Sequence, residues 1–250
     1  MHKRNLDLEL EKARMVQNML LPQAFPDLHA AELAFRFQPY YDISGDFLDY
    51  YYKKNSQELG FIICDVSGHG IPSALLAVMM KMALQLWGEY IHDPAGTMHK
   101  VRKMYNGKLD TYHVSAILGY LDLKSGRLRC VNAGHPAMLL CNPGSDQVRE
   151  IKPAGSIIHE DLMHYPFEEF ETILQPGDRL LLYTDGLTEA SNEAGEMLDT
   201  EGLIDLYLQN KNLDVDSMCQ KIMTAVHDYT LAGKLLSDDI SLFAIDYKGA

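Results

Sequence analysis

The chain has 250 residues, of which 47% are hydrophobic and 23% are charged, a composition typical of a globular protein with a sizeable core. This composition excludes a chain that is disordered over most of its length. The 22 basic and 35 acidic residues give a formal charge of −13. Because that charge repels nucleic-acid phosphates and anionic lipid headgroups, it argues against a nucleic-acid or membrane-surface role and favours a protein that holds cations.

The four cysteines are far apart in the sequence, and no pair has the spacing of a zinc site or a redox motif. We expect them to be reduced, buried thiols in a cytoplasmic protein. The longest apolar run, 74–86, is interrupted by Lys81 and Gln85 and is shorter than the roughly 18–20 residues of a membrane span. The charged segment 1–11 lacks the apolar core of an export signal. We therefore expect no membrane-spanning segment in this chain.

The first predicted element is an amphipathic helix that ends at Leu21, before Pro22. Its apolar stripe follows steps of three and four residues and consists of Leu6, Leu10, Ala13, Gln17 and Leu20. Two heptads are too few for a coiled coil that is stable alone. Two interpretations stay open, a helix packed on its own domain and a linker helix that dimerises. We treat 1–21 as a linker or dimerisation helix and 22–250 as one domain.

The rest of the chain alternates between runs of strands and pairs of helices. Strand patterns cover 33–38, 47–53, 59–66, 114–121, 128–132, 137–141, 168–174, 179–184 and 240–247. Helical patterns cover 71–90, 94–105, 200–209 and 215–231, and the first is apolar on all sides, which predicts a largely buried helix. The strands read as a meander of hairpins. This order predicts an α+β fold with antiparallel sheets in layers and helices on the outside.

Aspartates recur where a strand gives way to a turn of small residues. These places are Ser44-Gly45-Asp46, Asp65-Val66-Ser67-Gly68, Thr184-Asp185-Gly186 and Ser237-Asp238-Asp239. A single aspartate at such a place is usually a turn cap, but four together indicate a common site. Strand ends hold side chains on a rigid scaffold, and glycine beside an acid lets a ligand approach closely. Oxygen ligands without histidine or cysteine spacing suit Mg²⁺ or Mn²⁺ rather than zinc.

These motifs and their order resemble the metal-dependent protein phosphatases, the PPM or protein phosphatase type 2C superfamily, in its bacterial SpoIIE/RsbU-like branch. The resemblance covers about 20–247 and rests on ARMVQNMLLP at 13–22, SGDFLD at 44–49, CDVSGHG at 64–70, NAGHP at 132–136, YTDGLTEA at 183–190 and SDDISL at 237–242. It implies a layered α-β-β-α sandwich of two antiparallel sheets flanked by helices, in agreement with the layers predicted from the pattern.

The resemblance also implies a site with two Mn²⁺ or Mg²⁺ ions. The implied ligands are Asp46, Asp65, the carbonyl of Val66, Asp185, Asp238 and, as an alternative to the last, Asp239. Asp65 would bridge the two ions. The candidate catalytic residues are Asp46, Asp65, Asp185, Asp238 and His69. Two such ions can hold a bridging water as hydroxide near neutral pH, so that no covalent enzyme intermediate is required.

Of four other residues near the motifs, two have more than one interpretation. His69 is either a general acid or a residue that orders the glycine-rich loop. Asp49 is either an outer-sphere partner of the metal or an ordinary exposed strand residue. His135 is expected to be structural, and Arg36 is expected to face solvent.

The function implied by the resemblance is that of a serine/threonine protein phosphatase. Its substrate would be a bacterial signalling phosphoprotein such as an anti-sigma-factor antagonist. Its N-terminal helix would form a homodimer and would connect an upstream sensory domain to the phosphatase domain. One alternative is a catalytically inactive phosphatase-like domain that binds a partner. Another is a nucleotide-binding ATPase with a phosphate cradle at 68–70, which the absence of a P-loop lysine opposes. The retained acids favour the phosphatase.

Overall fold

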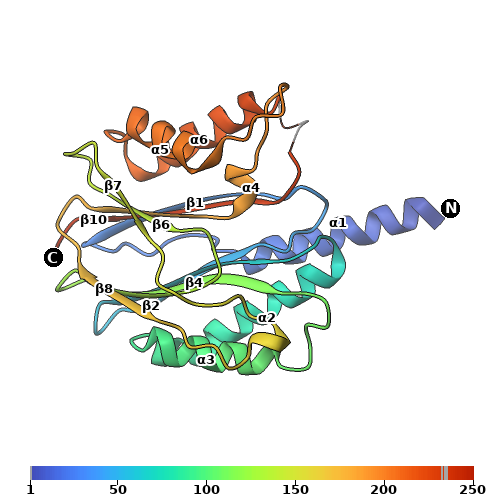
Figure 1. The fold of residues 1–250 in the computed structure, drawn as a ribbon, viewed down its shortest axis with the longest axis horizontal. Coiled ribbons are helices and arrows are strands. Elements are labelled where there is room, and N and C mark those ends of the chain that lie inside the picture. Colours follow the sequence, from blue (N-terminus) through green and yellow to red (C-terminus); the bar gives the residue numbers. More distant parts are fainter. Residues whose placement is uncertain (1, 232, 234–235) are drawn as a thin grey trace.

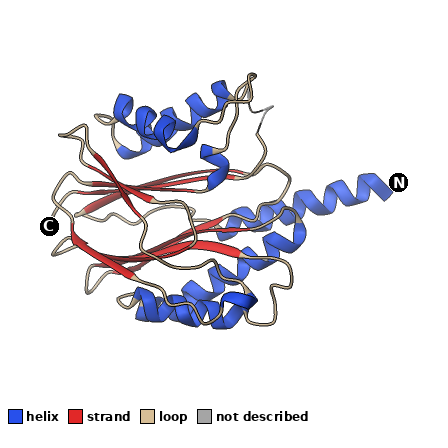
Figure 2. Ribbon diagram, viewed as in Figure 1, coloured by secondary structure: helices blue, strands red, loops and turns tan. Residues whose placement is uncertain are grey.

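Two five-stranded antiparallel sheets lie face to face in the computed structural model, which describes residues 2–231, 233 and 236–250 (Figures 1 and 2). The first sheet has the order β1 (Ala31–Gln38), β10 (Ile240–Tyr247), β9 (Arg179–Tyr183), β6 (Met138–Cys141) and β7 (Val148–Ile151). The second has the order β2 (Phe47–Lys53), β3 (Glu58–Val66), β4 (Val114–Asp122), β5 (Arg127–Ala133) and β8 (Glu169–Ile173). The predicted sandwich of antiparallel sheets is confirmed.

Helices cover the outer face of each sheet (Figure 1). The second sheet is covered by α2 (Ile71–Trp87), the short η1 (Gly88–Tyr90) and α3 (Pro94–Tyr105), and the first by α5 (Asp199–Asn210) and α6 (Val215–Tyr229). Two short helices, α4 (Asp185–Thr188) and η2 (Glu160–Leu162), lie in connecting segments. The N-terminal helix α1 (His2–Leu20) extends beyond the sandwich at its N-terminal end (Figure 1). The predicted α-β-β-α layering is therefore confirmed.

The core lies between the sheets and continues beneath the helices. The rings of Phe61 in β3 and Phe243 in β10 come from different sheets, and their centroids are 6.4 Å apart. A side chain at Gly119 of β4 would come within 2.0 Å of the Phe61 ring, so this glycine makes room for it. Because helices cover the outer faces, β3 is buried on both faces from Leu59 to Cys64 and lacks the alternation of a half-exposed strand.

The structure corrects three details of the sequence prediction. The strands do not form one meander, because the segment 132–136 takes the chain from β5 in the second sheet to β6 in the first. The strand β7 and the helix α4 were not predicted. The helix α2 is not largely buried, since it buries one face, including Ala77 and Met80, while Leu75 and Leu86 are 65% and 62% exposed.

One helical stretch among the described residues, 71–90, is long and apolar enough to cross a membrane by length and composition alone, with a mean hydropathy of 1.3. In the fold, its buried face packs on β2 and β3. The four cysteines, Cys64, Cys130, Cys141 and Cys219, are all buried free thiols, as expected.

Candidate metal-binding active site

The four acidic turns meet at one end of the sandwich. Asp46 directly precedes β2, Asp65 lies near the end of β3, Asp185 begins α4 after β9, and Asp238 lies two residues before β10. The pKa of Asp65 is raised to about 7, first by burial and then by the charges of neighbouring acids, namely Asp185, Asp238, Asp239 and Glu189. The fold thus gathers carboxylates as far apart in the sequence as Asp46 and Asp238, which are 192 residues apart, as the motifs predicted.

Small residues allow the turns to approach one another. A side chain on Gly45 would come within 2.6 Å of the carbonyl oxygen of Val66, and one on Gly186 within 2.0 Å of the carbonyl oxygen of Asp239. The Val66 N–H donates a hydrogen bond of 3.2 Å to the Gly45 carbonyl. Glycine is required at these two positions because backbone from another turn occupies the space of a side chain.

Asp46 is held from the opposite sheet. Its Oδ2 accepts hydrogen bonds of 2.7 Å from the hydroxyl groups of both Thr184 and Ser241. Burial raises the pKa of Asp46 well above its usual range, and the charges of Asp65 and Asp239 raise it further, while the two hydroxyl groups act in the opposite direction. Since both bonds fall on Oδ2, neither of them occupies Oδ1, which is oriented by them for a ligand.

Asp238 and Asp239 have different surroundings, although they are adjacent. Asp239 is 5% exposed, and its two carboxylate oxygens accept backbone hydrogen bonds from the N–H of Tyr40, at 2.7 Å, and of Gly45, at 2.9 Å. Asp239 therefore holds the turn that carries Asp46. Asp238 is half-buried and accepts the N–H of Asp239 at 2.8 Å through Oδ1. The arrangement favours Asp238 as the ligand and Asp239 as its structural neighbour.

The loop after Asp65 begins helix α2 and carries His69. Gly68 and Gly70 adopt positive φ angles of 82° and 88°, which glycine reaches without steric cost. The His69 side chain is exposed, and its ring centroid lies 4.6 Å from that of Tyr41. The pKa of Asp238 is raised, first by burial, and the charge of His69 acts in the opposite direction. His69 thus lies at the rim of the acid cluster, a position that suits a general acid and equally a residue that orders the loop.

A second histidine at this rim, His113, was not predicted. The backbone N–H of His113 donates to the Ser67 hydroxyl, and the backbone carbonyl of His113 accepts the Ser67 N–H, both at 2.9 Å. Burial and the charge of His159 lower the pKa of His113, and Asp185 raises it. No motif surrounds His113 in the sequence. The only signal is its place at the start of a buried strand that pairs with the strand of Asp65.

Side-chain contacts bear on the sequence interpretations of three residues, Asp49, Arg36 and His135. Asp49 is not an exposed strand residue, because it is buried and forms an ion pair with Lys81 of α2. Arg36 does not simply face solvent, since its guanidinium pairs with Asp216 of α6 at 2.9 Å. His135 is fully buried as expected of a structural residue, and its Nδ1 lies 2.7 Å from the Ser115 hydroxyl.

The donor set fits a hard divalent cation. The site offers carboxylate oxygens and the Val66 carbonyl, and the acids raise the pKa values of their neighbours because their negative charges repel one another. Over the residues that the structure describes, no group of three or more histidine, cysteine, aspartate or glutamate side chains is placed so that it could hold a metal ion as it stands. The fit therefore rests on donor chemistry and on the shared charge of the cluster.

Comparison with known proteins indicates the family to which this chain belongs. A sequence model of the family described as Stage II sporulation protein E (SpoIIE) matches residues 55–248. The phosphoserine phosphatase RsbU of Bacillus subtilis is 24% identical over 96% of this chain and 70% of its own length. The phosphoserine phosphatase RsbP of the same organism is 26% identical over 98% of this chain, which spans 59% of RsbP.

Solved structures share the whole fold. The SiaA-PP2C domain of Pseudomonas aeruginosa has a TM-score of 0.86 and 20% identity, with 99% of each chain covered. A structure of the PP2C phosphatase domain of SpoIIE from Bacillus subtilis has a TM-score of 0.73 and 15% identity over 86% of this chain and 63% of that one. With its sandwich, its six motifs in order and the family match over most of its length, the chain belongs to the SpoIIE family, in the RsbU-like branch of the PPM phosphatases.

Proposed function

We propose that this protein is a Mn²⁺- or Mg²⁺-dependent serine/threonine protein phosphatase. The observation that carries the proposal is the meeting of Asp46, Asp65, Asp185 and Asp238 from four separate turns, with the pKa of Asp65 raised to about 7 by burial and then by the charges of the other acids. Such mutual repulsion is the state that a bound cation relieves. Membership of the SpoIIE family and the phosphoserine phosphatases RsbU and RsbP among the relatives support the same activity.

The residues of the chain would divide the work between binding and orientation. When two divalent ions are bound, they supply charge neutralisation for the phosphoryl group and a water that is acidic enough to act near neutral pH. Asp65 would contact both ions, with Asp46 and the Val66 carbonyl on one side and Asp185 and Asp238 on the other. Thr184 and Ser241 hold Asp46 in one orientation, and this orientation fixes its free oxygen before the ions bind.

The proposed substrate is a phosphoserine or phosphothreonine on a bacterial signalling protein, such as an anti-sigma-factor antagonist, in the cytoplasm. The rim of the acid cluster suits a phosphorylated segment that lies across it, because His69 and His113 provide N–H donors beside the acids. Support for this substrate comes from the relatives RsbU and RsbP, whose names describe phosphoserine phosphatases.

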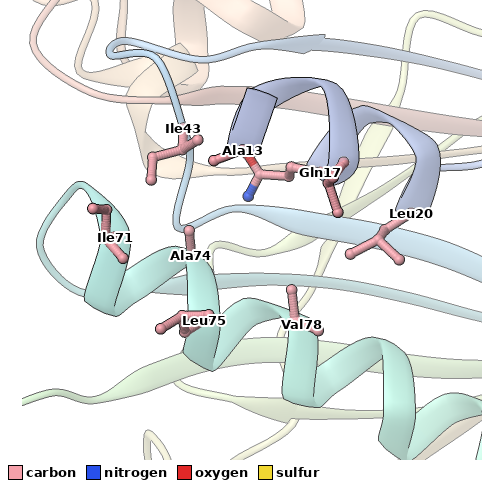
Figure 3. A pocket seen from close by; sticks show the side chains of 9 residues that line it. Ala13, Gln17, Leu20, Ile43, Ile71, Ala74, Leu75 and Val78 are labelled. Carbon is pink, nitrogen blue, oxygen red and sulfur yellow. The ribbon is translucent and has the colours of Figure 1, made fainter. Parts of the chain in front are cut away.

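The helix α1 has two apolar faces, and each suits one of the two interpretations of the sequence. Ala13 and Leu20 line a groove against α2 of the same chain, as Figure 3 shows. Leu8, Met15 and Met19 are 53%, 56% and 67% exposed. We propose that this exposed row forms a homodimer contact and transmits the state of an upstream sensory domain. Of the predicted stripe, the side chain of Leu6 lies outside the part that the structure describes.

The activity is tested by hydrolysis of p-nitrophenyl phosphate and of a phosphoserine peptide with and without Mn²⁺, next to a nucleotide-binding measurement. The proposal expects hydrolysis of both compounds only with the metal. Binding of the phosphopeptide without any hydrolysis would favour the inactive partner-binding domain. Tight binding of ATP with release of phosphate from ATP alone would favour the nucleotide-binding alternative.

A further inference from the structure

A glutamine of the N-terminal helix binds the backbone beside the first acidic turn. Gln17 in α1 donates from Nε2 to the carbonyl of Ser44 at 2.7 Å, and the N–H of Ser44 donates back to Oε1 of Gln17 at 2.9 Å. A primary amide presents one donor and one acceptor side by side, as a neighbouring peptide group does. Gln17 therefore satisfies both backbone groups of Ser44 across 27 residues of sequence.

The surroundings of this pair make it more than a surface contact. Ser44 is fully buried, and the groove that Gln17 lines is otherwise formed by apolar side chains, including Ala13, Ile43 and Ala74 (Figure 3). Figure 3 shows the Gln17 amide directed from α1 toward the segment of Ile43. Hydrogen bonds in such surroundings are costly to lose, because the separated backbone groups have little access to water.

The turn that Gln17 holds is the one that orients Asp46. The Asp46 N–H donates to the Ser44 hydroxyl at 3.0 Å, so Ser44 is bonded both to Gln17 and to the acid two residues on. The next residue, Gly45, donates to Asp239 and accepts from Val66. The turn is thus fixed by α1 on one side and by the last and second acidic motifs on the others.

We propose that Gln17 is a positioning residue that makes the place of Asp46 depend on the docking of α1. This inference rests on the proposed function, because it assigns Asp46 to the metal-binding site. Gln17 itself is directed to the backbone of Ser44 and acts on the site only through that residue. Gln17 is the polar residue in the otherwise apolar stripe of α1. Its hydrogen-bond partner, Ser44, lies within the same chain.

The experiment compares the wild-type chain with Gln17→Met, which keeps the length of the side chain and removes both hydrogen-bonding groups. Gln17→Glu is a second variant, since its carboxylate still accepts from Ser44 but no longer donates. Gln23→Met is the matched control. Gln23 also donates to backbone carbonyls at the end of α1, those of Asn18 at 2.6 Å and Leu21 at 2.9 Å, but it does not contact the Ser44 turn.

Two measurements report on the contact between Gln17 and Ser44. They are Mn²⁺ affinity by calorimetry and hydrogen exchange of the Ser44 amide. We expect Gln17→Met to weaken Mn²⁺ binding roughly tenfold and to speed exchange at Ser44 roughly tenfold, as the loss of two partly buried hydrogen bonds suggests. Gln17→Glu should fall between wild type and Gln17→Met. Gln23→Met should resemble wild type in both measurements. Saturating Mn²⁺ should restore turnover, since Gln17 acts only through the ligand.

The two proposals fail in different ways. If wild type binds Mn²⁺ and Gln17→Met binds it equally well with unchanged exchange at Ser44, Gln17 is a packing residue and the inference is wrong. If wild type binds no Mn²⁺ at all, the proposed function fails. Exchange at Ser44 still tests the hydrogen bonds between Gln17 of α1 and the turn of Ser44. If Gln17→Met does not fold, Gln17→Glu with wild-type affinity and exchange would equally overturn the inference.

Discussion

The hydroxyl of Thr184 donates a hydrogen bond of 2.7 Å to Oδ2 of Asp46, although the two residues come from different sheets. Thr184 follows β9 in the first sheet, and Asp46 precedes β2 in the second. Ser241 of β10 donates to the same oxygen. One acid of the cluster is therefore held by the sheet opposite its own, so the geometry of the site depends on the packing of the two sheets. Loss of either hydroxyl should affect ligand binding before it affects the fold.

Removal of one charge from the acid cluster should abolish activity and preserve the fold. We expect Asp65→Asn and Asp185→Asn each to reduce Mn²⁺-dependent hydrolysis by at least a thousandfold, because each variant loses an anionic ligand. Without metal, both should be at least as stable as wild type, since the remaining acids repel one another less. Turnover at saturating Mn²⁺, with metal content measured, checks this. Near-wild-type rates in both variants would contradict the assignment of Asp65 and Asp185 as metal ligands.

Divalent cations should stabilise the folded chain, most strongly near neutral pH. The folded pKa of Asp65 is about 7, well above the value near 4 of an unfolded aspartate, so the metal-free protein should lose stability as pH rises from about 4 through 7. Mn²⁺ or Mg²⁺ should offset this loss by binding to the folded state, and chelation should restore it. Thermal melts at several pH values give the answer. A melting temperature indifferent to millimolar metal at pH 8 would contradict the prediction.

The neighbouring residues Asp238 and Asp239 should respond differently to the same substitution. In Asp239→Asn, the new NH₂ group would face a backbone N–H, either of Tyr40 or of Gly45, so unfolding should become easier by about 2 kcal/mol. In Asp238→Asn, the oxygen that accepts from the Asp239 N–H is retained. This variant should keep its stability and bind Mn²⁺ at least tenfold more weakly. Denaturant unfolding and calorimetry distinguish the two, and the reverse pattern would make Asp239 the ligand.

His135 should make the protein sensitive to acid. Burial lowers its pKa to about 3, against about 6.5 in the unfolded chain, so its contribution to stability is present above pH 6.5 and is lost as pH falls toward 3. The expected loss is about 1.4 kcal/mol for each pH unit in that window. His135→Gln, which cannot take up the proton, should lack this component of the pH dependence. Parallel slopes for wild type and variant between pH 6.5 and 4.5 would contradict the burial of a neutral imidazole.

The exposed row of α1 should control association. Met15→Glu with Met19→Glu places charges on the face that is directed away from the groove, and we expect this double variant to sediment as a monomer. Wild type should be only partly dimeric, because two heptads bury a small area. Arg14→Glu, also on the exposed surface of α1, is the control for added charge. Unchanged association of the double variant would reduce α1 to a helix packed on its own domain.

Much of the fold was accessible from the sequence because its signals are local. The boundaries of β2, α3 and β10 agree with the predicted ranges, since each has a clear periodicity and a turn or cap at its ends. The acidic turns were likewise visible, because aspartate beside glycine at a strand end is a local pattern. The strand β7 was missed because it has four residues, two of them charged, and pairs only at the edge of a sheet.

The roles of individual side chains depended on distant partners and could not be predicted. The sequence left Asp49 open between an outer-sphere partner of the metal and an exposed strand residue, and its ion pair with Lys81 of α2 was not visible in it. Asp238 and Asp239 are adjacent residues of the same type, so the sequence alone cannot tell which is the ligand. Only the backbone N–H groups that donate to Asp239 distinguish them. Gln17 was visible only as a member of the helical stripe, because its partner, Ser44, lies beyond the helix and the first strand. Each case is a contact between segments that no local pattern connects.

The burial of the cysteines bears on how this protein would behave in an oxidising cell. Peroxide reacts with exposed thiolates, and it silences enzymes that depend on one. Here Cys64, next to Asp65, is fully buried, and its pKa is raised well above the usual range by burial and by the acids around it. Its thiol stays protonated and shielded from oxidants. A signal carried by this protein would therefore persist through oxidative stress that interrupts signals carried by cysteine-dependent phosphatases.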